Sequence, residues 1–157
     1  MTRRPDRPRA FYGGILLLGI ASGMRAQIGV ATVVRSVPPA ALPRSLRRAF
    51  VRRALTAGAL GELVADKLPS IPARTEPPGL AARALTGLAS GVLVARTMGL
   101  AAKRAAVVGS LTAVPAAYGG LALRRYLTSR LPAVAAAGVE DLLAGSLAYA
   151  GIRLARS

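Results

Sequence analysis

The sequence predicts an all-α fold, a polytopic helical membrane protein with about four to five short membrane helices rich in alanine and glycine. Apolar residues make up 53% of the chain and are mostly Ala, Leu and Val, while only 4% of the chain is aromatic. A soluble core of this size normally draws on larger side chains for volume. Small residues instead suit helices that pack backbone to backbone in lipid. Long apolar runs separated by arginine and proline clusters complete the pattern.

The chain divides into a short tail and one helical domain. Residues 1–9 are basic and interrupted by proline, which predicts a disordered tail. Residues 10–157 are predicted to form a single helical membrane domain. Pro69 and Pro72 end its second helix, and Pro115 predicts a kink in its fourth. The expected helices cover residues 10–34, 45–68, 80–100, 105–123 and 132–154.

Composition excludes several kinds of chemistry. The chain has no Cys and no His, which rules out disulfides, thiol nucleophiles, zinc sites and histidine acid–base catalysis. An oxygen-ligand metal site stays open, but no cofactor is expected. The formal charge of +16 could indicate nucleic acid. However, the arginines lie at the ends of apolar runs and stacking aromatics are scarce. We therefore expect a lipid bilayer with anionic headgroups as the partner, and no nucleic acid.

Membrane orientation does not follow from the sequence. With five spans, ten Arg and Lys residues fall on the side of the tail and eleven on the other, with Arg25 inside the first span. The positive-inside rule needs an asymmetry that this count lacks.

Buried charges form the predicted functional centre. The chain has six acids, and Glu62, Asp66, Glu140 and Asp141 fall inside apolar segments. Glu62 and Asp66 are four residues apart and so share one face of a helix. Carboxylates where desolvation is costly predict a buried polar centre. Arg25, well inside the first helix, either snorkels to the interface or pairs with one of these carboxylates. Lys67 and Arg74 are secondary members of the centre.

Two further patterns concern packing and symmetry. Gly19 with Gly23, and Gly87 with Gly91, are small-residue pairs one turn apart that could join two copies in a homodimer. Residues 61–65 and 138–144 resemble each other with one insertion, which suggests an inverted repeat with its site at the interface of the halves.

Four segments carry a resemblance to a known family. They are Ser22-Gly23-Met24-Arg25-Ala26, Glu62-Leu63-Val64-Ala65-Asp66-Lys67-Leu68-Pro69, Pro72-Ala73-Arg74-Thr75 and Glu140-Asp141. In these the chain resembles the bacterial integral-membrane family catalogued as domain of unknown function 4126, over most of its length beyond the tail. The basic insert between the first two helices does not align. The resemblance implies a multi-pass protein of the bacterial cytoplasmic (inner) membrane, without an assigned activity.

Three functions fit these observations. The first is a small transporter or channel for a cation, proton or small solute, with Arg25 and the four carboxylates as its polar centre. The second is a structural or assembly protein, a homo-oligomer whose ion pairs only hold helices together. The third is an intramembrane enzyme acting on lipid, which ranks last because His, Cys and a phosphate-binding glycine loop are absent. No catalytic activity is expected.

Overall fold

The fold is helical throughout the part of the chain that the computed structural model describes, residues 7–65 and 75–157. This confirms the all-α prediction, but the count of four to five helices is not confirmed. The described residues form seven α-helices and one 3-10 turn, Pro39–Ala41, and they contain no strand. The α-helices are α1 (Arg7–Met24), α2 (Ile28–Ser36), α3 (Arg44–Arg47), α4 (Ala49–Ala65), α5 (Pro77–Thr97), α6 (Ala102–Thr128) and α7 (Ala133–Arg156).

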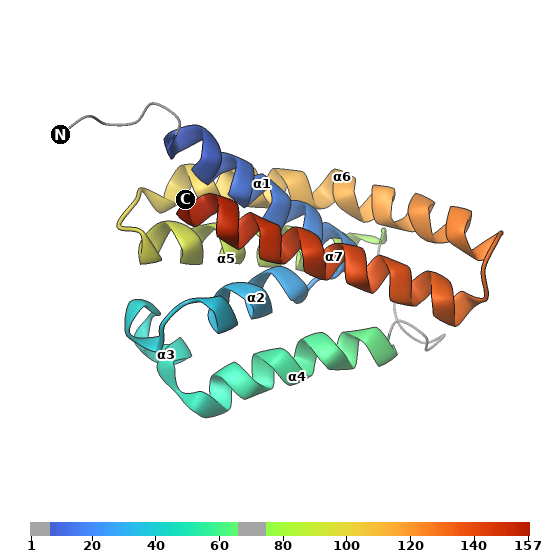
Figure 1. Ribbon diagram of the computed structural model, residues 1–157, viewed down its shortest axis with the longest axis horizontal. Coiled ribbons are helices and arrows are strands. Elements are labelled where there is room, and N and C mark those ends of the chain that lie inside the picture. The colour runs from blue at the N-terminus through green and yellow to red at the C-terminus, as the bar shows by residue number, and fades with distance from the viewer. Residues whose placement is uncertain (1–6, 66–74) are drawn as a thin grey trace.

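Helix α1 is the centre of the bundle and packs against α5, α6 and α7 (Figure 1). Glycine makes these contacts close. A Cβ on Gly14 would overlap the backbone of Gly151 and Ala155 on α7, and one on Gly19 would overlap α6. Gly87 on α5 and Gly109 on α6 face each other in the same way, each too close to the other's carbonyl oxygen to carry a Cβ. The bundle therefore packs backbone to backbone, as small residues allow.

The first predicted helix is in fact two helices. Residues 10–34 were expected to form one span, but α1 ends at Met24 and α2 begins at Ile28, running back along α1 (Figure 1). Gly29 of α2 sits so close to Ser22 and Ser90 that a Cβ there would overlap both hydroxyls. Tertiary packing thus folds the chain back, and hydropathy alone did not reveal it because both halves are apolar.

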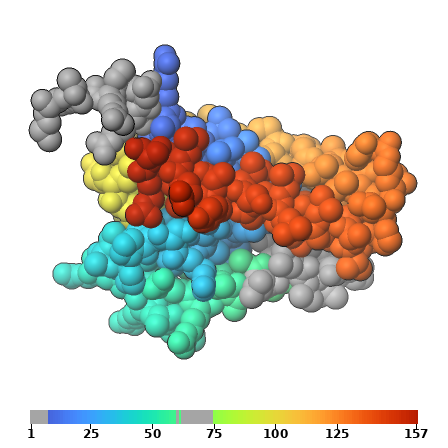
Figure 2. Space-filling view, in the orientation of Figure 1, coloured from blue at the N-terminus to red at the C-terminus, as the bar shows by residue number. Residues whose placement is uncertain are grey.

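The basic segment after α2 forms a separate layer. The predicted helix 45–68 is split at Arg48 into α3 and the longer α4, and residues 66–68 lie outside the described part. Leu42 is buried in the core and holds the start of this segment in place. Helix α4 packs on α2 and lies along the outside of the molecule (Figures 1 and 2).

The last three predicted helices are present with shifted ends. Helix α5 begins at Pro77, three residues before the expected start, since proline is favoured in a first turn. It ends in a turn where Leu100 N donates to Ala95 O and Gly99 has a φ of 66°. Helix α6 is longer than expected at both ends and continues through Pro115 without interruption.

Within the described residues, three helices are long and apolar enough to cross a membrane: α5, α6 and α7, with 21, 27 and 24 residues. At 1.5 Å per residue even α5 is about 32 Å long, against a hydrocarbon core of about 30 Å. Many large apolar side chains on these helices face outward, which suits lipid surroundings better than water. The most exposed are Leu85, Leu111, Val134 and Leu142.

The glycines proposed for a homodimer are used within the chain. Gly19 and Gly23 of α1 pack on α6, and Gly87 and Gly91 of α5 pack on α6 from another side. A dimer stays a prediction, but its surface would lie elsewhere while this packing is kept. The inverted repeat also stays a prediction. Helices α4 and α7 run in opposite directions, as it requires, but α7 packs on α1 and α4 on α2 (Figure 1).

Candidate functional site: a buried arginine–carboxylate cluster

Arg25 lies at the break between α1 and α2 and is buried, with 2% of its side chain exposed. Its Nε donates to Asp141 Oδ1 of α7 at 2.6 Å, and its Nη2 forms an ion pair with the same oxygen. Of the two alternatives for Arg25, the structure therefore shows a buried partner and not snorkelling. Two nitrogens on one carboxylate fix the direction of the guanidinium group.

Glu140 lies between two arginines. Its side chain is fully buried, and its Oε2 accepts a hydrogen bond from Arg124 Nε of α6 at 2.7 Å. The same oxygen is 3.9 Å from Arg25 Nη2. Adjacent residues on a helix point about 100° apart, so Asp141 reaches Arg25 from one direction and Glu140 from another. The four side chains form one cluster that joins α1, α6 and α7.

Arg83 is a further buried cation close to this cluster, with 5% of its side chain exposed. Its Nε donates to Gly23 O, in the last turn of α1, at 3.1 Å, and its Nη1 donates to Gly79 O. Positive charge is favourable at a helix C-terminus because the last carbonyls have no partner within the helix. Arg83 thus stabilises the end of α1 where Arg25 follows.

The structure brings together three of the predicted site residues: Arg25, Glu140 and Asp141. Glu62 lies within α4, but its side chain is outside what the structure describes. Asp66 is outside the described residues altogether, as are both secondary members of the predicted centre, Lys67 and Arg74.

Sequence reasoning missed Arg83 and Arg124 as members of the site. Arg83 is a single cation inside an apolar run. Arg25 was selected as a site residue for the same reason, so the sequence offered the signal for Arg83 as well. Arg124, like the other arginines at the ends of apolar runs, was expected to face lipid headgroups. Its pairing with Glu140 follows from the turn between α6 and α7, because residues equally far from the turn of an antiparallel helix pair lie side by side.

The cluster lies off the centre of the bundle. Glu140 is the eighth of the 24 residues of α7. It is about 10 Å along the axis from the start of α7 and about 24 Å from its end. The cluster therefore lies nearer the turn between α6 and α7.

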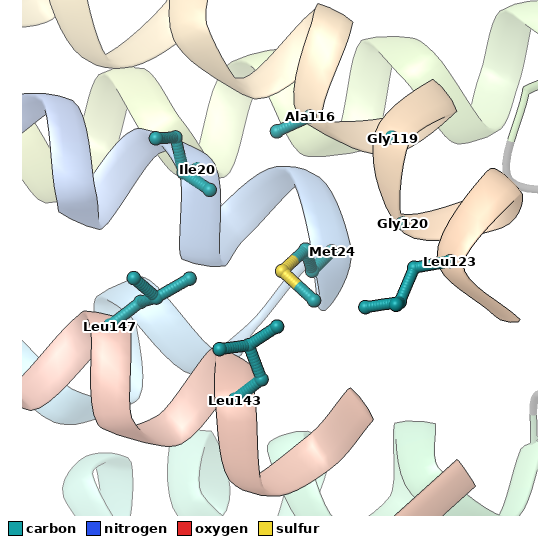
Figure 3. Close-up of a pocket in the computed structure, with 8 residues that line it drawn as sticks. All are labelled: Ile20, Met24, Ala116, Gly119, Gly120, Leu123, Leu143 and Leu147. Carbon is teal, nitrogen blue, oxygen red and sulfur yellow. The ribbon is translucent and has the colours of Figure 1, made fainter. Parts of the chain in front are cut away.

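An apolar cavity of about 190 Å³ adjoins the cluster between α1, α6 and α7 (Figure 3). Met24 lines it from α1, Leu123 from α6 and Leu143 from α7. These residues neighbour Arg25, Arg124 and Glu140 in sequence, but the lining itself carries no charged side chain. The cavity offers apolar contact and no polar group that would hold an ion.

The fold and this cluster define the class of protein: a helical membrane protein with a buried arginine–carboxylate pair. Comparisons with family models, with curated proteins and with solved structures gave no match. Within residues 7–65 and 75–157, no three Asp, Glu, His or Cys side chains are grouped as metal ligands.

Proposed function

We propose that the protein is a small transporter or channel for a cation, proton or small solute, and that the arginine–carboxylate cluster is its gate. One observation carries this proposal: Glu140 lies between Arg124 and Arg25, 2.7 Å from one and 3.9 Å from the other, where α1 is interrupted. Ionisable groups inside a membrane are costly, and in membrane proteins they commonly mark ion and substrate pathways.

In this proposal Glu140 exchanges its partner between the nearer arginine, Arg124, and the more distant one, Arg25. A small movement of Glu140 toward Arg25 would strengthen that ion pair and release Arg124. Discontinuous helices often line the sites of transporters, because their ends present backbone polar groups away from lipid. The break at residues 25–27 places such ends beside the cluster.

The exposed fractions of the four side chains in the cluster support the same proposal. Arg25 and Glu140 are buried, whereas Asp141 is 25% exposed and Arg124 is 22% exposed. Each buried charge therefore has a more exposed neighbour of opposite sign. This arrangement gives a solute a route from the surface to Arg25 through one exchange of partners.

A structural role is the second candidate, and the apolar cavity favours it. Arg25 and Glu140 are both paired, and the space beside them is lined by apolar side chains. In this alternative the ion pairs orient α1, α6 and α7 and nothing moves through them.

The absence of cysteine in the chain allows a direct test of water access. Ala137→Cys places a thiol one turn before Glu140, at a buried position on α7. A membrane-impermeant thiol reagent would be applied to sealed vesicles carrying this variant, alone and combined with Arg124→Gln. Ser129→Cys, in the exposed turn after α6, is the positive control, and Leu111→Cys, on the outward apolar face of α6, is the lipid-facing control.

A gate predicts that Arg124→Gln increases labelling of the cysteine at position 137 while the protein stays folded. Proton flux into vesicles, followed with an internal pH dye, should then be lost in Glu140→Gln and kept in the matched α7 variant Ser146→Ala. If the cysteine stays unlabelled with Ser129→Cys reacting, and Arg124→Gln only lowers the yield of folded protein, the structural role holds instead.

The proposal also includes a location in a bacterial cytoplasmic membrane and assembly as a homodimer. The resemblance to the family of domain of unknown function 4126 supports a place in a bacterial cytoplasmic membrane. A homodimer would need a surface outside the glycine contacts described above.

A further inference from the structure

The break between α1 and α2 distributes the basic residues between the two ends of the bundle differently from the five-span arrangement that the sequence predicted. Because α2 runs back along α1, the end of α2 lies beside the start of α1 and the end of α7. Arg156 Nη1 donates to Ser36 O at 3.1 Å, and Gly14 packs on Gly151 and Ala155. The segment after α2 therefore lies at the same end as the start of α1, and not at the opposite end as five spans would require.

Thirteen of the 22 basic residues lie at this end of the bundle. Two are at the start of α1, one is Arg35 in α2, five lie between Arg44 and Arg53, three between Arg96 and Arg104, and two near the end of α7. The opposite end carries three, Arg124, Arg125 and Arg130, while Arg25 and Arg83 are buried between the ends. The other four lie outside the described residues.

Acidic residues do not offset this charge in the described part of the chain. Glu76 precedes α5 at the opposite end, Glu140 and Asp141 belong to the buried cluster, and Glu62 lies in the second half of α4. The end that carries thirteen cations is therefore strongly positive, and we refer to it as the basic end.

From this asymmetry we infer that the basic end faces the cytoplasm and binds the anionic phospholipid headgroups of that leaflet. Cytoplasmic segments of membrane proteins carry an excess of Arg and Lys, and anionic lipids attract such segments. In this arrangement α1 and α2 form a re-entrant hairpin that enters and leaves on the cytoplasmic side.

The corner between α3 and α4 is suited to headgroups. Phe50 is 80% exposed among arginines 44, 47, 48, 52 and 53, and an apolar side chain surrounded by cations suits the depth of the lipid headgroups. Arg44, Arg48 and Arg53 are exposed, and a lipid phosphate would accept hydrogen bonds from their guanidinium groups.

Sidedness tests this inference independently of any transport activity. Ser45→Cys in α3, Ser157→Cys after α7 and Ser129→Cys after α6 would each be treated with an impermeant thiol reagent in right-side-out and in inverted vesicles. We expect the first two to react in inverted vesicles only and the third in right-side-out vesicles only. Reaction of Ser45→Cys and Ser157→Cys on opposite sides, on the outer side, or each on both sides would overturn it.

Lipid preference tests the headgroup contact. The variant Arg44→Gln/Arg48→Gln/Arg53→Gln removes three exposed cations for which the structure records no side-chain hydrogen bond. In mixed vesicles of anionic and zwitterionic phospholipid, it should retain about threefold less anionic lipid on extraction than the wild type. Arg125→Gln/Arg130→Gln, at the opposite end, is the matched control and should change retention little. Equal retention by the triple variant and the wild type would overturn the headgroup contact.

Discussion

Arg124 and Glu140 lie eight residues on either side of Pro132, and their side chains meet across the α6–α7 turn at 2.7 Å. The pair joins the two antiparallel helices close to the turn between them. Because Glu140 is also within 3.9 Å of Arg25, the turn is coupled to the end of α1. The α6–α7 turn therefore contributes to holding the centre of the bundle.

Replacing Arg25 should be the most damaging change in the cluster. Arg25→Gln leaves Asp141, whose side chain is 25% exposed, without its short ion pair, and leaves the fully buried Glu140 with one cation fewer. Leaving such polar groups without a partner costs about 1 to 3 kcal/mol. We expect that loss in the free energy of unfolding, measured by denaturant titration in detergent micelles. Arg35→Gln, an exposed cation on α2, is the matched control and should change stability by less than about 0.5 kcal/mol. Equal effects of the two variants would contradict a buried ion pair.

Adding a methyl group between α5 and α6 should separate these helices. Gly87→Ala places a Cβ against Gly109 O, and overpacking of this kind costs about 1 to 3 kcal/mol. Gly138→Ala on α7 is the control, because nothing lies within 4 Å of its added Cβ. Alanine there should stabilise the helix by up to about 1 kcal/mol. Thermal unfolding of both variants in one detergent gives the comparison, and a stabilising Gly87→Ala would show that the helices are farther apart.

The turn between α5 and α6 requires glycine. Gly99 has a φ of 66°, and its neighbour Leu100 donates to Ala95 O in a helix-ending motif. Gly99→Ala should cost about 1 to 2 kcal/mol, because a Cβ is unfavourable in the left-handed region. Asn tolerates that region better, so Gly99→Asn should recover part of the loss. The order Gly, Asn, Ala in melting temperature is the expected result, and the reverse order of Asn and Ala would contradict it.

Ser22 and Gly29 offer a test of the α1–α2 hairpin. The Ser22 hydroxyl is buried and has no hydrogen-bond partner among residues 7–65 and 75–157, and a Cβ on Gly29 would overlap it. Ser22→Ala should therefore stabilise the protein by about 1 kcal/mol, since an unsatisfied buried hydroxyl is removed. Gly29→Ala should destabilise it, and the double variant should recover part of that loss. Strictly additive effects in the double-mutant cycle would show that α2 does not lie against Ser22.

The sequence predicted the outer bundle well, because apolar runs between proline and arginine clusters locate α5, α6 and α7 to within a few residues. It also paired Arg25 correctly as one of two alternatives. It missed the break after Arg25, since hydropathy reports burial and not direction, and the turn is determined by the fit of Gly29 between Ser22 and Ser90. The equal charge count at the two ends followed from that single error.

The contact between Arg25 and Asp141 spans 116 residues of chain. During synthesis a ribosome delivers Arg25 to the membrane before Asp141. At about 5 to 20 residues per second, roughly 6 to 23 seconds of synthesis separate them. When α1 enters the membrane, α5, α6 and α7 have not yet been made. These three helices then arrive beside α1 one after another. The ion-pair cluster is therefore complete only when α7 arrives, and chains stopped before that helix should be the substrates of membrane quality control.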